Sequence, residues 1–188
     1  MIDRTKVIPR LRANTPMDMA GMIDMIIALW QEVGNNEVVM KFADMSKWED
    51  YPCVALRTIS SVLPTDQRER RPRHRETIID PERQDEFIEM LGQVRENIIE
   101  FKIYALTPDE ADILHEKFED FLFIYTPHFT QQGIQKFYFY RQLEDGLITE
   151  WHNPVITRTV QYQVRIERVT FVRMGELNDI HISIQHPL

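Results

Sequence analysis

The first clear pattern in the chain is that of an amphipathic helix. Apolar residues recur at spacings of three and four, which is the period of one buried helical stripe: Met19, Met22, Ile23, Ile26, Trp30 and Val33. Thr15 is suited to cap this helix, Pro16 to be its first residue and Gly34 to end it. Four methionines lie here; a flexible methionine surface can receive a partner, but we favour the interpretation that they fill a core.

Four segments have the patterns of β-strands. Residues 52–63 are rich in β-branched side chains and precede Pro64, and residues 134–143 form another apolar run. Two segments alternate, with these side chains predicted to face inward: Ile99, Phe101, Ile103 and Ala105 in residues 97–106, and Val160, Tyr162, Val164 and Ile166 in residues 157–168. In the last segment the residues predicted to face water are Gln161, Gln163, Arg165 and Glu167.

A second helix is predicted between the two alternating segments. Thr107, Pro108 and Glu110 form a capping box at its start. Its inner stripe comprises Leu114, Phe118, Phe121 and Tyr125, and its outer surface is acidic: Asp109, Glu110, Asp112, Glu116, Glu119 and Asp120. Pro127 and Gly133 are expected to separate the helix from the strand that follows.

This order of elements predicts a single α+β domain over residues 1–188. Its core, about residues 16–172, is a mostly antiparallel four-stranded sheet with both helices on one face. Residues 64–96 form an insertion between the first two strands. Residues 174–188 form a C-terminal arm in which Ile180, Ile182 and Ile184 alternate with polar residues. Since no local partner strand follows from the sequence, we expect this arm to pair with another chain.

A cluster of positive charge lies inside the predicted insertion. Five arginines and a histidine gather in a chain of net charge -8: Arg68, Arg70, Arg71, Arg73, His74 and Arg75. The stretch is opposite in sign to the acidic helix surface and comparable to it in length, which favours a contact with an acidic partner, either another subunit or a different protein. A solvated loop, partly neutralised by Glu69 and Glu76, and a contact with DNA are the alternatives. The overall acidity argues against strong DNA binding.

Catalytic and metal-binding patterns are weak. The chain has no Gly-rich phosphate loop and no paired Cys motif. Its single cysteine, Cys53, is expected to be a buried structural thiol rather than a nucleophile, and it indicates a reducing compartment. Two further groups are more typical of a solvated surface than of an acid–base pair or a metal site: Glu150 with His152, and Asp112 with His115 and Glu119. We therefore expect no enzyme activity, no cofactor, no metal and no membrane segment.

The order of elements resembles the tail-terminator, or head–tail joining, family of bacteriophages with contractile tails. The resemblance covers about residues 16–172 and rests on three segments: PCVALRTISSVLPTD, NIIEFKIYALTPDEADIL and ITRTVQYQVRIERVTF. It is a similarity of element order rather than of a diagnostic motif. The insertion at residues 64–96 and the C-terminal arm depart from small members of the family.

The resemblance implies a structural protein of the virion, assembled in the host cytoplasm and located at the tail–neck junction. Such a protein forms a ring, usually a hexamer, that caps the tail tube and joins it to the neck. Its partners are its own copies, the tail tube or the sheath, and the neck or connector; DNA passes through the bore without being read. The alternatives are another neck, tail-completion or baseplate component, a dimeric α+β ligand-binding module, and an enzyme.

Overall fold

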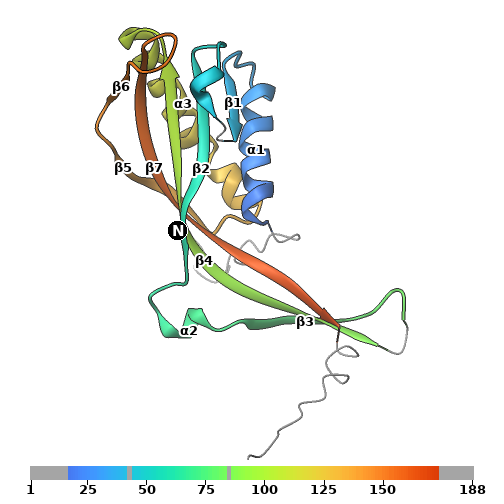
Figure 1. The fold of residues 1–188 in the computed structure, drawn as a ribbon. Helices are drawn as coiled ribbons and strands as arrows, with labels where there is room; N and C mark the ends of the chain where they lie inside the picture. The colour runs from blue at the N-terminus through green and yellow to red at the C-terminus, as the bar shows by residue number, and fades with distance from the viewer. Residues whose placement is uncertain (1–16, 42–43, 84–85, 174–188) are drawn as a thin grey trace, which may run out of the picture.

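The protein is an α+β fold built on one seven-stranded mixed sheet (Figure 1). The computed structural model describes residues 17–41, 44–83 and 86–173. The strands are β1 (Val38–Lys41), β2 (Cys53–Val62), β3 (Arg73–Ile79), β4 (Phe87–Ala105), β5 (Lys136–Gln142), β6 (Gly146–Ile148) and β7 (Val155–Arg173). Five of them follow the order β1-β2-β4-β7-β5, while β3 pairs with β4 and β6 with β7.

The predicted α+β class is confirmed, but the predicted four-stranded sheet is wrong. The sheet gains the short strands β1, β3 and β6, of which β1 runs parallel to β2. All other pairs are antiparallel. Strands as short as β1 and β6, with four and three residues, are too brief to show an alternating pattern in the sequence.

The first long helix begins later than predicted. The helix α1 (Met19–Glu32) is capped by Asp18, whose carboxylate accepts a hydrogen bond from the amide of Gly21 at 2.7 Å. Thr15 and Pro16, the predicted cap and first residue, lie outside the described residues. Gly34 follows the helix with a φ of 84°, in the left-handed region that favours glycine, as the sequence predicted for its end.

The second long helix, α3 (Pro108–Gln131), begins where predicted and ends later. Thr107 and Glu110 form the predicted capping box, with both hydrogen bonds at 3.3 Å. Pro127, expected to stop the helix, lies inside it. Proline removes one backbone donor, but the turn beyond it places Phe129 in the core with no exposed surface, which offsets that loss. Gly133, with a φ of 107°, marks the actual end.

Both long helices pack against one face of the sheet. Trp30 of α1 lies with its ring centroid 5.2 Å from Phe118 and 5.1 Å from Phe121, both on α3. Of the predicted inward residues of α1, β4 and β7, Met19 is half-buried and the following are confirmed as buried: Met22, Ile23, Ile26, Trp30, Ile99, Phe101, Ile103, Ala105, Val160, Tyr162, Val164 and Ile166. On α3 the buried members are Leu114, Phe118 and Phe121, with Tyr125 half-buried. Val33, predicted to be buried, is exposed.

The opposite face of the sheet is also covered at one end. A second cluster, near the short helix η1 (Met45–Lys47), contains Met45, Cys53, Ala55, Tyr104 and Val155. Next to it a polar row crosses four strands through the hydrogen bonds Arg57–Glu100, Glu100–Gln161 and Gln161–Arg141. Gln161, which was predicted to face water, is instead buried, and its side-chain amide donates to Glu100 and accepts from Arg141 within this row.

Strands β4 and β7 continue beyond the helices and form an arm (Figure 1). We define the body as the part of the sheet covered by α1 and α3. We define the arm as β3 with residues 87–95 of β4 and 166–173 of β7; from here on, "the arm" means this part of the sheet and not the predicted C-terminal arm at residues 174–188. A short helix, α2 (Gln67–Arg70), lies at the base of the arm. The predicted insertion at residues 64–96 thus contains α2, β3 and the first half of β4, so its last ten residues are continuous with the central sheet.

Candidate interaction surfaces

An ion pair across three strands holds the arm together. Arg75 on β3 donates from Nε to Glu167 Oε1 on β7 at 2.7 Å, and a second contact joins Arg75 Nη2 to Glu167 Oε2. This hydrogen bonding raises the pKa of Arg75 above its ordinary value. Gly92 of β4 lies between the two side chains, and a Cβ there would stand 1.9 Å from Glu167 Oε1. Arg75 is therefore engaged within its own chain.

Two further arginines form ion pairs near the two ends of the arm. Arg165 on β7 pairs with Glu96 of β4 and, at 3.2 Å, with Glu69 of α2. Arg173 pairs with Asp80 at 3.0 Å and with Glu82 at 2.8 Å. Arg165 and Glu167, predicted to face water, are half-buried and form ion pairs within their own chain. Arg165 has a raised pKa, because Glu96 accepts its hydrogen bond.

The other predicted interface arginines remain on the surface. Arg70 donates to the carbonyl oxygen of Pro64 at 2.8 Å, and Arg73 reaches the carbonyl oxygen of Arg68 at 3.5 Å. Within the described part of the chain, the guanidinium groups of Arg68 and Arg71 make no hydrogen bond or ion pair. All four side chains are exposed. The stretch is thus ordered as α2 and β3, and it presents positive charge at the base of the arm.

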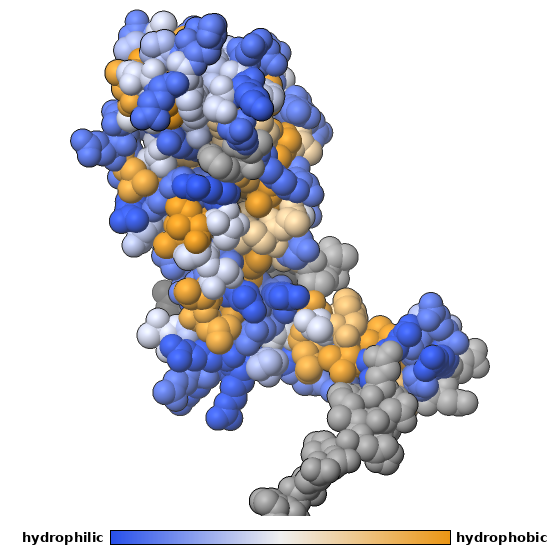
Figure 2. All heavy atoms as spheres, in the orientation of Figure 1, coloured by the Kyte–Doolittle hydropathy of each residue, from blue (hydrophilic) through white to orange (hydrophobic). Residues whose placement is uncertain are grey.

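The arm carries an apolar surface. We name as the arm patch Ile78, Ile88, Met90, Val169 and Phe171. In the strand registers, Ile78 pairs with Ile88, Met90 with Phe171, and Val169 with Gly92, so the five residues share one face. Phe171 is 56% exposed, and the other four are half-buried. Figure 2 shows apolar residues grouped on the arm between a hydrophilic base and a hydrophilic tip.

A second exposed surface lies on α3, pointing away from the sheet. We name it the outer face of α3; its members, spaced three and four residues apart, are Asp109, Ile113, Glu116, Asp120, Phe123 and Ile124. Phe123 is 80% exposed, Ile113 67% and Ile124 65%. Among the described residues, few large apolar side chains are as exposed as these, and acidic residues surround them.

One of the predicted acidic interface residues is already paired, and another lies close to a histidine. Asp112 accepts a hydrogen bond from Arg158 at 2.8 Å, and Glu119 lies 3.8 Å from His115. Asp109 and Glu116 are exposed and lie on the outer face of α3. The third part of the predicted interface, Ile180, Ile182 and Ile184, lies outside the described residues.

Sequence reasoning missed the exposed apolar residues of both surfaces. A signal for one was present, since Phe121, Leu122, Phe123, Ile124 and Tyr125 are consecutive. A helix turns by about 100° per residue, so one sheet cannot bury all five side chains. Phe171 had a weaker signal, because an apolar residue near the end of a strand is common.

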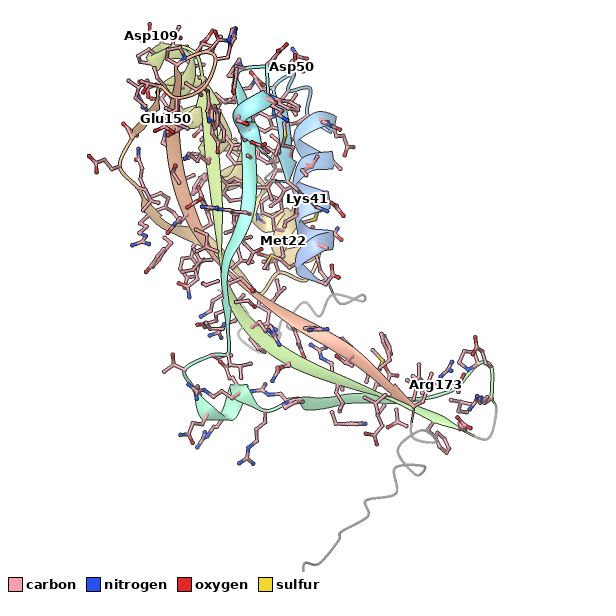
Figure 3. The ribbon with its side chains drawn as sticks, viewed as in Figure 1. Met22, Lys41, Asp50, Asp109, Glu150 and Arg173 are labelled. Atoms are coloured by element: carbon pink, nitrogen blue, oxygen red, sulfur yellow. The ribbon has the colours of Figure 1, made fainter. Side chains whose placement is uncertain are left out.

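The residues considered for chemistry do not form a catalytic group. Cys53 is fully buried, and burial raises the pKa of its thiol to about 12. Glu150 and His152 are exposed near the end of the body opposite the arm, where Figure 3 labels Glu150. Among the described residues, no cluster of three or more His, Cys, Asp or Glu side chains is arranged to hold a metal ion.

Two open hollows lie where the start of α1 meets the base of the arm. Their volumes are about 540 and 280 Å³. The smaller is lined by Asp18, Ser61, Arg95, Asn97 and Arg168, among others. Nε of Arg95 is buried there without a hydrogen-bond partner in the described part of the chain.

Comparison with protein families and with curated proteins gives no match. No protein-family model matches the chain, and no curated protein matches it in sequence. Of the helices described, none is both long and apolar enough to cross a membrane.

Proposed function

We propose that this protein is a structural component of a phage virion, a tail terminator that forms a ring on the end of the tail tube. The ring, a hexamer in the proposal, joins the tube to the neck, and DNA passes through its bore without sequence-specific contacts. Its partners are its own copies, the tail tube or sheath, and the neck protein. The order of elements supports this assignment, because it resembles that of the tail-terminator family; the similarity does not by itself establish a relationship.

The observation that carries the proposal is the arm. A three-stranded ribbon with an exposed apolar patch extends from a body that already has a complete core. Apolar patches of this kind are typical of protein–protein contact sites. Basic residues lie at the base of the arm, whereas Asp109 lies at the far end of the body, as Figure 3 shows. Different surfaces at different places on one chain are what a closed ring of identical copies requires.

The C-terminal residues extend the proposal. On the side of β7 away from β4, the described strands leave residues 166–173 without a neighbour, since β5 pairs only as far as Arg165. An open strand edge of this kind accepts an added strand. Residues 178–186, with Ile180, Ile182 and Ile184 on one side, supply a strand of matching length to the next copy. Removing all residues after Arg173 is expected to leave the body folded and to weaken ring assembly.

The experiment that tests the proposal is mass measurement of single particles of the purified protein, with and without tail tubes. We expect closed rings of one size, formed alone at high concentration or on the tube ends. Electron microscopy of the same sample shows whether particles sit at tube ends. A protein that stays monomeric at all concentrations and never binds tubes contradicts the proposal.

A further inference from the structure

We infer that the arm patch of one copy packs on the outer face of α3 of a second copy of this chain. This inference rests on the proposed ring, for which it names the contact surfaces. Phe171 on the arm, and Phe123 and Ile124 on α3, are its apolar centre. The arginines at the base of the arm and the carboxylates of α3 are its charged rim.

Exposure of apolar side chains is the first argument. Phe123 and Ile124 are adjacent in the chain and are 80% and 65% exposed, while Phe171 is 56% exposed. Both surfaces are exposed in the same copy, so neither covers the other within one chain. Large aromatic side chains with apolar neighbours are typical of interface centres. A contact between the two surfaces removes all three side chains from water.

The second argument is the order of charged and apolar residues, which is the same along the arm and along α3. On the arm, the exposed Arg68, Arg71 and Arg73 precede the apolar Ile78 in sequence. On α3, Asp109, Glu116 and Asp120 precede Phe123 and Ile124. The five residue steps from Arg73 to Ile78 span about 17 Å, and the fifteen steps from Asp109 to Ile124 span about 22 Å. Side-by-side packing therefore brings opposite charges together at one end and apolar residues together at the other.

Disulfide cross-linking tests the contact directly. The variant carries Phe123→Cys and Phe171→Cys, and the native Cys53 does not interfere because it is fully buried. Since both replaced side chains are largely exposed, we expect the variant to fold, which circular dichroism verifies. After oxidation, the double variant should give a ladder of cross-linked species up to the closed ring on a non-reducing gel. Each single variant should remain monomeric on that gel, because the contact joins different surfaces.

The cross-linking outcomes separate this inference from the proposed function. Rings that form without a ladder overturn the arm–α3 contact and leave the ring proposal intact. Cross-linked dimers of the Phe171→Cys variant alone also overturn it, because two arm patches then face each other. A protein that gives neither ladder nor rings, even with tail tubes, overturns both.

A charge exchange supplies an independent readout. Changing Arg71 and Arg73 to Glu is expected to weaken assembly about tenfold or more, because exposed ion pairs contribute little singly but add up in a group. Adding Glu116→Arg and Asp120→Arg should restore assembly to near the native level. As a matched control, Lys136→Glu reverses an exposed charge on β5 and should change little. Failure of the exchange to restore assembly contradicts the pairing of these two surfaces.

Discussion

The body and the arm are built from the same two strands, β4 and β7, yet they are stabilised in different ways. In the body these strands lie under α1 and α3, and Phe101 and Val160 have no exposed surface. Among the described residues, neither α1 nor α3 covers the arm patch, and ion pairs such as Arg75–Glu167 and Arg173–Asp80 tie the strands together. The unbroken register of β4 and β7 also places the two apolar groups on opposite faces of the sheet: Phe101 faces the helices, whereas Met90 lies on the other side of the same strand.

This difference indicates where the protein is rigid by itself and where a partner is needed. A buried aromatic side chain contributes several kcal/mol, whereas the gain from an ion pair with a buried partner, such as Arg173–Asp80, is largely offset by the cost of removing its charges from water. The arm therefore gains less from packing than the body does, because its apolar patch is only half-buried or exposed. We therefore attribute the folding stability of the protein mainly to the body, and its assembly to the arm.

The largest effect is expected from removing a large side chain in each region. Phe101→Ala in the body should lower the free energy of unfolding by about 3–5 kcal/mol, because it leaves a cavity in the core. Phe171→Ala in the arm should change it by no more than about 0.5 kcal/mol, because the side chain is already exposed. Urea denaturation of the two variants measures both values. Equal losses would mean that the arm patch is part of the folding core.

A smaller effect is expected at Gly92, where the arm is most tightly packed. Gly92→Ala places a Cβ where Glu167 now lies, so the Arg75–Glu167 pair must separate, at a cost of about 1–3 kcal/mol. Hydrogen exchange should accelerate in the arm and stay unchanged in the body. Combining Gly92→Ala with Glu167→Ala removes the clashing atom, so the pair of changes should cost less than their sum. If the cost of the double variant equals the sum of the two single costs, the destabilisation by Gly92→Ala does not come from a clash with Glu167.

Parts of this contrast could be predicted from the sequence. The helical stripe that includes Trp30 and the capping box of Thr107 are local patterns, and both are confirmed except for Val33, the last residue of the predicted stripe, which is exposed. The full length of β4 was not predicted, because Gly92, Arg95 and Glu96 interrupt its apolar alternation. Those residues make sense only beside β3 and β7, where Glu96 meets Arg165 and Gly92 gives room to Glu167.

The candidate surfaces were harder to predict than the fold. The sequence showed that positive charge gathers at residues 68–75, but it could not show that Arg75 pairs with Glu167, which is 92 residues away. Likewise, the sequence could not show that Asp112 of α3 pairs with Arg158 of β7, which is 46 residues away. Long-range ion pairs leave no spacing signal, so only the structure separates engaged charges from exposed ones.

The smallest effect concerns Cys53, in the covered end of the body. Burial raises the pKa of its thiol to about 12, so the reactive thiolate is disfavoured in the folded state. At pH 8, a thiol-specific chromogenic reagent should react slowly with the native protein and rapidly in denaturant. Because the folded-state pKa lies above the unfolded value, this group's contribution to stability is present below about pH 9 and is lost as the pH rises toward 12. Rapid reaction of the native protein at pH 8 would show that this end of the body opens.

Hydrogen exchange in the free and the assembled protein tests the division between body and arm most directly. Mass spectrometry of peptides compares β3, the arm halves of β4 and β7, α3, the body strands and residues 180–184. We expect assembly to slow hydrogen exchange in the arm, in the C-terminal residues and on the exposed side of α3, while exchange in the body strands stays the same. Unchanged exchange in the arm after assembly would contradict it, as would strong protection of residues 180–184 in a demonstrated monomer, because the C-terminal strand would then pair within its own chain.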